Sequence, residues 1–398
     1  MISEKLVSSV KSYENEIVKL CSELVQIDTT NPPGNCSEVV NRLKEEYGNL
    51  GVRSFVVSED KEILQELGLE YPRENFVARA GPANTTVGLL IGTHMDVVPA
   101  YNTEEWRYPP FSGVISDGKV WGRGACDAKC SLVAQLYAVK ALVENEAPLR
   151  KSLVVAATVD DEAPGNKNQA GMQFLVDKGF GKVGIPLPEY AINAEASGLT
   201  EIWAKFSGHL TFSVDIRGSA AHPPMGVNAL NHMVHLMERV LNMDKGRVNI
   251  LHISCRTPED VGSTPNFARV ATRWSFNDKS VQQVEGKILE AIRIYEYENK
   301  VTLSLEPLES VDPVRINPHS KIVRAVKQAS ATVGVNAKYG GGIVGAGDLY
   351  HLLKNGIAGI TYGPGNLRYC HAVNEFVSTD ELVKATQIYA LCALMLCS

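Results

Sequence analysis

The sequence of 398 residues contains no apolar run approaching the ~20 residues that a membrane-spanning helix needs. It has no excess of basic residues either, since 39 Lys and Arg against 45 Asp and Glu give a net charge of −6. This balance argues against nucleic acid or an anionic membrane as the main partner. The first 20 residues lack the apolar core of a signal peptide and show an amphipathic helix pattern. We therefore expect a cytoplasmic protein.

The eight cysteines include no CxxC pair, which is the usual spacing of a structural zinc site or a redox motif. In an intracellular chain they are expected to be reduced thiols, mostly packed in the core. Cys126 and Cys370 differ from the rest because each immediately precedes a candidate metal ligand, Asp127 and His371. Packing beneath the site is their expected role, and a redox-sensitive site is the alternative.

Helical and strand patterns alternate along residues 1–204, and the length fits two or three domains of about 150 residues each. Apolar runs at 87–91 and 152–157 read as buried strands, and residues 37–51 and 132–146 read as helices. The alternation predicts an α/β domain with a mostly parallel sheet sandwiched by helices. Such sheets bind ligands at the carboxyl ends of their strands.

The pattern changes at residues 205–312, where the expected order of elements is strand, helix, strand, strand, helix, strand. This order predicts a ferredoxin-like α+β satellite domain. The α/β pattern returns afterwards, with a helix at 322–334, a strand at 358–363 and a final helix at 380–396. We therefore expect a catalytic domain made of residues 1–204 and 313–398, interrupted by the satellite domain.

Five residues of the metal-binding types stand in strand-end or loop contexts along nearly the whole chain: His94, Asp127, Glu162, Glu195 and His371. Two imidazoles and three carboxylates suit zinc, cobalt or manganese. If one carboxylate bridges two ions, each ion also receives one histidine and one further carboxylate. That arrangement leaves a position open for water, as catalytic metal sites do.

Four motifs surround these residues: GTHMDVVPA (92–100), GRGACDAK (122–129), TVDDE (158–162) and HAVNE (371–375). With this order and spacing, the chain resembles, from about residue 16 to 396, a family of two-metal amidohydrolases and exopeptidases. Acetylornithine deacetylase, succinyl-diaminopimelate desuccinylase, aminoacylase and glutamate carboxypeptidase belong to that family. The resemblance implies two divalent metal ions, most simply zinc, with cobalt or manganese as alternatives.

The resemblance also assigns roles to the residues of the first two motifs and to Glu195. It implies that His94 is a ligand and that the Asp96 carboxylate holds the other nitrogen of its ring. Asp127 takes the place of the bridging carboxylate, and Glu195 that of the second ligand of the first ion. The alternatives without metal binding are a surface His-x-Asp for His94 and Asp96, a helix N-cap for Asp127 and a surface glutamate for Glu195.

Glu162 and His371 take the places of the ligands of the second ion, and Asp161 takes the place of the general base. The family usually has glutamate at that last position, so the base here is one methylene shorter. A carboxylate beside the ions could still accept a proton from water. However, a misplacement of ~1 Å can cost about a hundredfold in rate.

The resemblance further implies a homodimer formed by the satellite domain, in which His222 reaches the partner's active site and stabilises an oxyanion. A packing or surface histidine is the alternative for His222. Candidate substrate contacts are Asn228, Asn266, Gly345 and Gly365. Asn228 has an obvious structural alternative, which is to cap the helix that follows it.

The expected reaction is hydrolysis of the amide bond of an N-acyl amino acid, by water that the metal pair and Asp161 activate. A dipeptidase or carboxypeptidase of the same family is the alternative, and a metal-binding protein without catalysis is the rival from another class. The arginine that often follows the FN of the satellite domain is missing, because Asp278 and Lys279 stand there. The GIVGAGD loop (342–348) also lacks a hydroxyl group. Both departures favour a substrate with a less charged tail.

Overall fold

The computed structural model describes the chain in seven ranges: residues 2–66, 68–162, 170–222, 225–243, 247–256, 264–340 and 347–398, without the side chain of Arg256. The described chain forms two compact units. The first contains the residues up to Ala204 and those from Ile316 onward, and the second is Lys205–Arg315.

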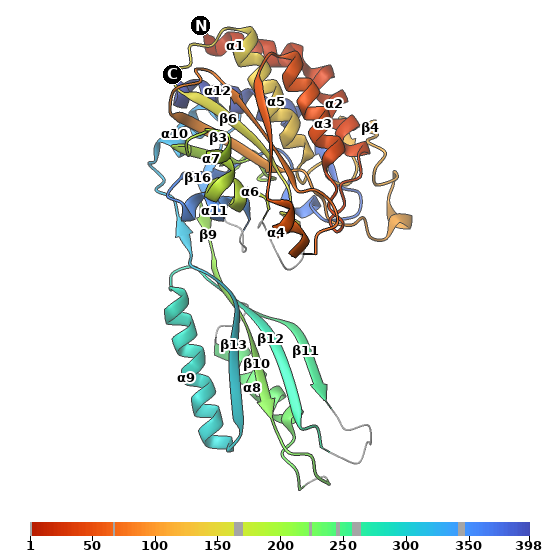
Figure 1. Ribbon diagram of the computed structural model, residues 1–398, viewed down its shortest axis with the longest axis vertical. Coiled ribbons are helices and arrows are strands. Elements are labelled where there is room, and N and C mark those ends of the chain that lie inside the picture. The colour runs from red at the N-terminus through yellow and green to blue at the C-terminus, as the bar shows by residue number, and fades with distance from the viewer. Residues whose placement is uncertain are drawn as a thin grey trace. The chain divides into compact units, whose positions relative to one another are not determined.

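An eight-stranded sheet forms the centre of the first unit (Figure 1). In spatial order its strands are β1 (Arg53–Ser58), β2 (Glu74–Ala80), β6 (Ser152–Thr158), β3 (Val87–His94), β7 (Tyr190–Asn193), β16 (Ala358–Thr361), β8 (Glu201–Trp203) and β15 (Lys338–Gly340). The four central strands, from β6 to β16, run parallel. β1, β2 and β6 pair antiparallel, as do β16 and β8. The predicted α/β class is confirmed, with a mixed sheet whose parallel part is at its centre.

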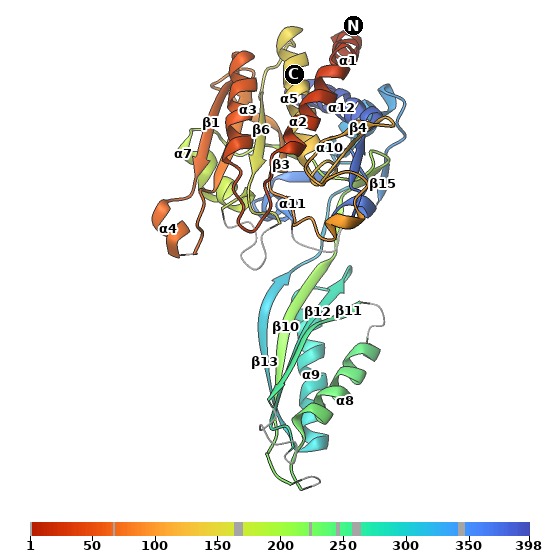
Figure 2. The ribbon, with the colours of Figure 1, turned by 90° about the vertical axis from the view of Figure 1, so that its right-hand side faces the viewer.

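Helices cover both faces of this sheet, as Figures 1 and 2 show. The helices of this unit are α1 (Ile2–Ser12), α2 (Glu14–Gln26), α3 (Ser37–Asn49), α4 (Lys61–Glu66), α5 (Lys129–Glu144), α6 (Met172–Phe174), α7 (Phe180–Lys182), α10 (Lys321–Thr332), α11 (Asp348–Lys354) and α12 (Thr379–Cys397), of which α4 lies beyond the edge of the sheet. α5 and α12 pack on β3 and on each other, and both are buried on nearly every side. Helices that are apolar all round belong in such an interior position.

A small sheet joins two loops that are far apart in the sequence. β17 (Phe376–Ser378) pairs with β5 (Lys119–Trp121), which pairs with β4 (Ile115–Ser116). Phe376 lies opposite Trp121, and the Gly122 amide donates to the Glu375 carbonyl at 2.9 Å. The loop at 122–127 therefore runs beside the loop at 371–375.

The second unit has its own apolar core and a four-stranded antiparallel sheet. Along the chain its main elements are β10 (Gly208–Arg217), α8 (Ala229–Met243), β11 (Val248–Arg256), β12 (Phe267–Phe276), α9 (Val281–Asn299) and β13 (Thr302–Val311). The spatial order β11-β12-β10-β13 is that of a ferredoxin-like unit. Its short strands β9 (Lys205–Phe206) and β14 (Val314–Arg315) pair with each other. These observations are consistent with the predicted satellite domain.

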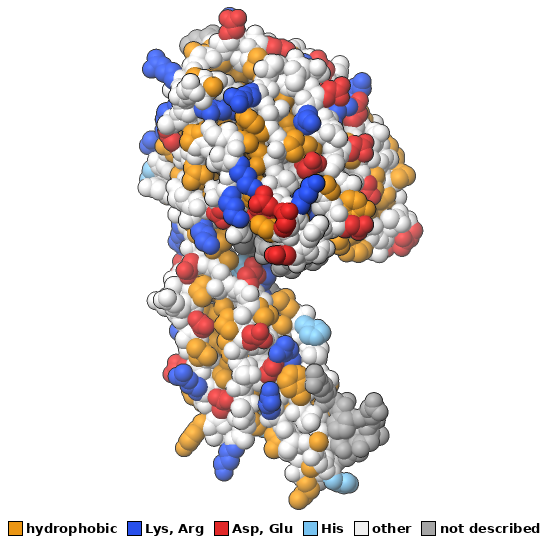
Figure 3. Space-filling model, viewed as in Figure 1, with side chains coloured by type: hydrophobic (Ala, Val, Ile, Leu, Met, Phe, Trp, Pro, Cys, Tyr) orange, Lys and Arg blue, Asp and Glu red, His pale blue; other side chains and the backbone are white. Residues whose placement is uncertain are grey.

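The surface carries charges of both signs. On the face shown in Figure 3, lysine and arginine side chains are scattered among acidic ones. None of the helices in the described ranges has the length and apolarity to cross a bilayer. The cytoplasmic location expected from the N-terminal sequence stays a prediction.

Candidate active site

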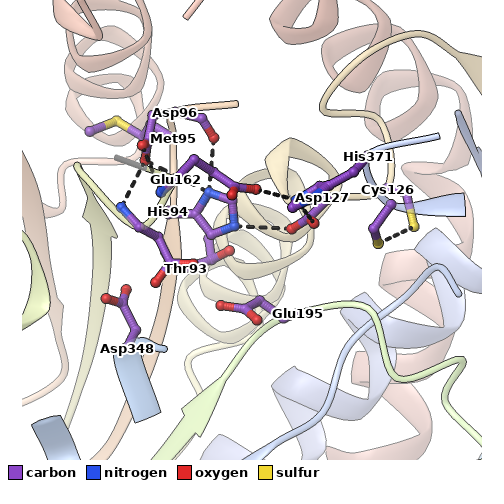
Figure 4. A network of polar contacts seen from close by, with 12 residues as sticks. Thr93, His94, Met95, Asp96, Cys126, Asp127, Glu162, Glu195, Asp348 and His371 are labelled. Carbon is purple, nitrogen blue, oxygen red and sulfur yellow. Dashed lines mark hydrogen bonds and ion pairs between the residues drawn. The ribbon is translucent and has the colours of Figure 1, made fainter. Parts of the chain in front are cut away.

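Three neighbouring strands deliver their polar side chains to one edge of the sheet. His94 is the last residue of β3, Asp161 and Glu162 follow β6, and Glu195 follows β7. Because these strands run parallel, their carboxyl ends meet at the same edge. The loops at 122–127 and 371–375 bring Asp127 and His371 to the same place (Figure 4).

Asp127 lies between the two imidazole rings. Its Oδ1 is 3.0 Å from Nε2 of His94, and its Oδ2 is 3.3 Å from Nε2 of His371. Nε2 of His371 is also 2.7 Å from Oε1 of Glu162. One carboxylate thus faces two histidines through separate oxygens, which is the arrangement expected of a residue that bridges two cations.

Two sets of donor atoms have the spacing of a metal site. His94, Asp127 and Glu162 each offer an atom within 4.8 Å of the others, and so do His94, Asp161 and Glu195. Nitrogen and carboxylate donors of this kind suit zinc and neighbouring divalent metals. The structure therefore brings all five predicted ligands together, and it places the predicted base among them.

The close packing of several carboxylates and two histidines shifts the pKa values of the groups in this cluster. Burial and the negative charge of Asp161 raise the pKa of Glu195 well above its usual value. Burial opposes the ionisation of Asp127, but hydrogen bonds from His371 and His94 hold its pKa below the usual range. Hydrogen bonds to Asp127 and Glu162 raise the pKa of His371 to about 10. Positive charge at this place is strongly stabilised, as a cation site requires.

The ring of His94 has a different partner from the one expected. Its Nδ1 is 2.9 Å from the backbone carbonyl of Asp96, whereas the Asp96 carboxylate is 3.8 Å away. A proton on Nδ1 leaves the lone pair of Nε2 for a metal. The expected carboxylate–histidine contact is therefore corrected to a carbonyl–histidine contact.

The carboxylate of Asp96 instead holds the turn that carries the base. It accepts hydrogen bonds from the amides of Asp161 and Glu162 at 3.3 and 3.0 Å, and from Nδ2 of Asn31 at 2.8 Å. Asp96 is fully buried, so these three donors compensate its charge. It is a positioning residue for the proposed base and for one proposed ligand.

Asp160 starts the same turn in a strained conformation, with φ of 64°. Its carboxylate is held by Nε of Arg73, with oxygens at 2.8 and 3.0 Å, and by Nδ2 of Asn31 at 3.0 Å. Sequence analysis did not identify Arg73 or Asn31. Asn31 precedes two prolines and a glycine, which marks a rigid loop, but no local pattern marks the buried Arg73.

Asp348, the final residue of the GIVGAGD loop, also lies near the proposed base. It is fully buried, begins α11 and accepts a hydrogen bond from Oγ1 of Thr158 at 2.7 Å. Burial and the charge of Asp161 raise the pKa of Asp348 well above its usual value.

A buried ion pair fastens the two ligand-bearing loops together. Arg123 and Glu375 are 2.5 Å apart, with side chains 2% and 0% exposed. Oε1 of Glu375 accepts the amides of Cys126 and Asp127 at 2.9 and 3.0 Å. Arg123 also donates to the carbonyl of His371 at 3.3 Å, where the backbone has φ of 61°. The pair therefore fixes the backbone on both sides of the Asp127–His371 contact.

Replacing Arg123 with methionine is expected to lower the free energy of unfolding by about 3–5 kcal/mol, because Glu375 remains buried without its partner. Urea unfolding followed by circular dichroism measures this change. Arg42→Met is the matched control: Arg42 is 34% exposed and pairs with Glu23 and Glu46. Its removal is expected to cost less than about 1 kcal/mol. Equal losses in both variants would contradict the role of the buried pair.

The remaining predicted site residues have the following positions. His222 and Asn266 are exposed in the second unit, and Gly345 lies outside the described residues. Oδ1 of Asn228 accepts the amide of Asn231 at 3.1 Å, so Asn228 caps α8, the structural alternative considered for it. Gly365 has φ of 86°, and a Cβ there would lie 2.4 Å from Sγ of Cys126. The substrate contacts of these residues stay predictions.

Comparisons with known proteins found a family model and relatives that match most of the chain. The model of Peptidase family M20/M25/M40 matches residues 90–395. A probable succinyl-diaminopimelate desuccinylase of Staphylococcus aureus (strain MRSA252) is 25% identical, over 94% of this chain and 96% of that protein.

Two crystal structures show the same fold. Aminopeptidase PepT from Bacillus cereus has a TM-score of 0.76 and 18% identity, covering 97% of this chain and 99% of its own. A dinuclear metal-binding peptidase of Bacillus subtilis has a TM-score of 0.72 and 14% identity, with coverage of 97% and 99%. The family model covers more than half of the chain, which therefore belongs to peptidase family M20/M25/M40, a family of metallohydrolases.

Proposed function

We propose that the protein hydrolyses the amide bond of N-acyl amino acids with two divalent metal ions. The observation that carries the proposal is the position of Asp127, whose two oxygens face His94 and His371. His94, Asp127 and Glu195 would hold the first ion, and Asp127, Glu162 and His371 the second. The dinuclear site of the Bacillus subtilis peptidase and the desuccinylase name of the Staphylococcus relative support this proposal.

In the proposed mechanism, bound divalent ions supply Lewis-acid polarisation of the amide carbonyl and lower the pKa of water. The carboxylate of Asp161 accepts the proton of the attacking water and delivers it to the leaving nitrogen. Asp161 is suited to this role because its carboxylate lies within 4.8 Å of the donor atoms of His94 and Glu195. The hydrogen bonds from the turn to Asp96 keep the shorter base in place.

Arg269 and Arg273 are two arginines of the second unit that could bind a negatively charged acyl group in place of the arginine missing after the FN. Arg269 makes two hydrogen bonds to Asp215 at 2.6 and 2.8 Å, and Arg273 bonds to Glu309 at 2.8 Å. Both guanidinium groups are therefore engaged by carboxylates of the chain itself. Together with Asp278 and Lys279 after the FN, this favours N-acetyl over N-succinyl substrates.

Amine release by the chelator-stripped protein, reloaded separately with zinc, cobalt and manganese, tests the proposed function. The panel contains N-acetyl amino acids, N-succinyl amino acids and dipeptides. We expect no turnover after stripping, recovery with at least one metal, and the highest kcat/KM for an N-acetyl amino acid. A preference for dipeptides would replace the deacylase with a dipeptidase. Absence of turnover on the whole panel with two ions bound would favour the non-catalytic rival.

We also propose that the second unit forms a homodimer in which His222 donates a hydrogen bond to the developing oxyanion of the partner's site. Exposed apolar side chains on α8 and on the edge strand β11 support a contact surface: Val234, Leu241, Ile250, Leu251 and Ile253. A donor of this kind contributes ~3 kcal/mol to the transition state. Sedimentation velocity that shows only monomers at micromolar concentration would overturn this assembly.

A further inference from the structure

Two cysteine side chains meet directly behind the proposed metal ligands. Sγ of Cys126 lies 3.5 Å from Sγ of Cys370, although the residues are 244 positions apart in the chain. Figure 4 shows Cys126 with this contact beside Asp127 and His371. Both sulfur atoms also approach the carbonyl oxygen of Asn366, at 3.6 and 3.8 Å. The two thiols therefore point at the same place from two different loops.

The surroundings of the two thiols differ. Cys126 is buried and packs against Gly365, where a Cβ would lie only 2.4 Å from its sulfur. Cys370 is partly exposed. An oxidant from solvent therefore meets Cys370 first, and Cys126 is already in position to react with the product. Core packing accounts for the burial of Cys126, but it does not account for a partly exposed second thiol directed at it.

We propose that Cys126 and Cys370 are a modification site, an oxidisable pair whose disulfide bond switches off the metal centre. Its effect on catalysis rests on the proposed function.

The oxidant is a peroxide of the hydrogen peroxide class. Sγ of Cys370 attacks one peroxide oxygen; the S–O bond forms, the O–O bond breaks, and the thiol proton of Cys370 leaves with the departing hydroxide as water. Sγ of Cys126 then attacks that sulfur, so that the S–S bond forms and the S–O bond breaks. The thiol proton of Cys126 leaves with the departing hydroxide as a second water. Two thiols lose two electrons, and one peroxide becomes two waters.

The bond would displace the ligands because of where the cysteines stand. The sulfur atoms must approach from 3.5 Å to ~2.05 Å. Cys126 is followed directly by Asp127, and Cys370 by His371, whose facing atoms are 3.3 Å apart. The amide of Cys126 donates to Glu375, which lies on the loop of His371, so a shift of either cysteine strains the contacts between the two ligand-bearing loops. A displacement of ~1 Å in a catalytic group can cost about a hundredfold in rate.

The test treats the zinc-loaded full chain with hydrogen peroxide, followed by catalase and removal of free zinc. Non-reducing peptide mass spectrometry detects the cross-link, elemental analysis counts bound zinc, and amine release measures activity. We expect a Cys126–Cys370 linked peptide, loss of at least one zinc ion per chain, and activity lowered by ~10–100-fold. Dithiothreitol and added zinc should restore all three readouts.

Three variants separate the pair from general oxidation. Cys370→Ser and Cys126→Ala are expected to keep their initial activity and their zinc under peroxide. Cys255→Ala, which removes an exposed cysteine of the second unit, should stay as sensitive as the unmodified chain. Three results would each overturn the proposal: no linked peptide, a linked peptide with zinc and activity unchanged, or equal sensitivity of Cys370→Ser. If the reduced protein hydrolyses none of the substrates, the proposed function fails. The peptide and zinc measurements then still show whether the Cys126–Cys370 disulfide forms and whether it releases zinc.

Discussion

Asp161→Asn is expected to lower kcat by about 10²–10⁴-fold, the usual contribution of a general base. The asparagine side chain has nearly the same size but accepts no proton at neutral pH. Its backbone amide still donates to Asp96, so the turn should keep its conformation. Steady-state kinetics with the best substrate of the panel measures the effect, and elemental analysis checks that both metal ions remain bound.

Asp161→Glu is the matched variant, because it restores the length that the family usually has at this position. Turnover well above that of the unmodified protein would show that the shorter base limits the rate. Unchanged activity in Asp161→Asn would remove Asp161 as the base. Loss of one metal ion in Asp161→Asn would instead make it a ligand, which its position with His94 and Glu195 also permits.

Asp127→Ala is expected to remove measurable turnover and to weaken the binding of both ions. The reason is that its two oxygens face the two imidazoles, so neither proposed ion keeps its full donor set. Without the carboxylate, the positive charges of the two ions would also repel each other with less compensation. Isothermal titration of the stripped protein with zinc measures the number of sites and their affinities.

Two other variants serve as controls, because they should change zinc binding less than Asp127→Ala does. Glu162→Ala removes a proposed ligand of the second ion, which also contacts His371, so the first of the two zinc sites should keep its affinity. Asn31→Ala removes a partner of Asp96 and Asp160, which typically costs about 10–100-fold in metal affinity or activity. If Asp127→Ala still bound two zinc ions with unchanged affinity, Asp127 would not be the bridge.

Much of the fold could be predicted because its elements carry strong local patterns. The helices at α3, α5, α10 and α12 and the buried strands β3 and β6 appear where their apolar periodicities indicate them. The element order of the second unit follows in the same way, since alternating strands and amphipathic helices differ clearly in period. The antiparallel pairing at the sheet's flanks did not follow, because pairing direction depends on how distant segments meet.

Some features of the candidate site could likewise be predicted from the sequence, and others could not. The ligand types follow from the resemblance of four motifs, in their order along the chain, to a two-metal family, and parallel strands bring the strand-end positions together. The partner of His94 could not be predicted, because a carbonyl and a carboxylate of the same residue compete for one ring nitrogen. Local backbone geometry decides between them. Arg73 was missed because a buried arginine has no local pattern until its carboxylate partner, 87 residues away, is known.

The sequence by itself determined the class of fold, the identity of the five candidate ligands and the donor chemistry that suits divalent metals. The class of fold depends on local periodicity, and the candidate ligands depend on residue type and on the resemblance of four motifs to a known family. Only the tertiary structure decided that Asp127 faces both histidines, that Arg123 and Glu375 fasten two loops, and that Cys126 meets Cys370. Each of those contacts joins segments more than 30 residues apart. Their geometry is set by the packing of the whole first unit, which no short stretch of sequence encodes.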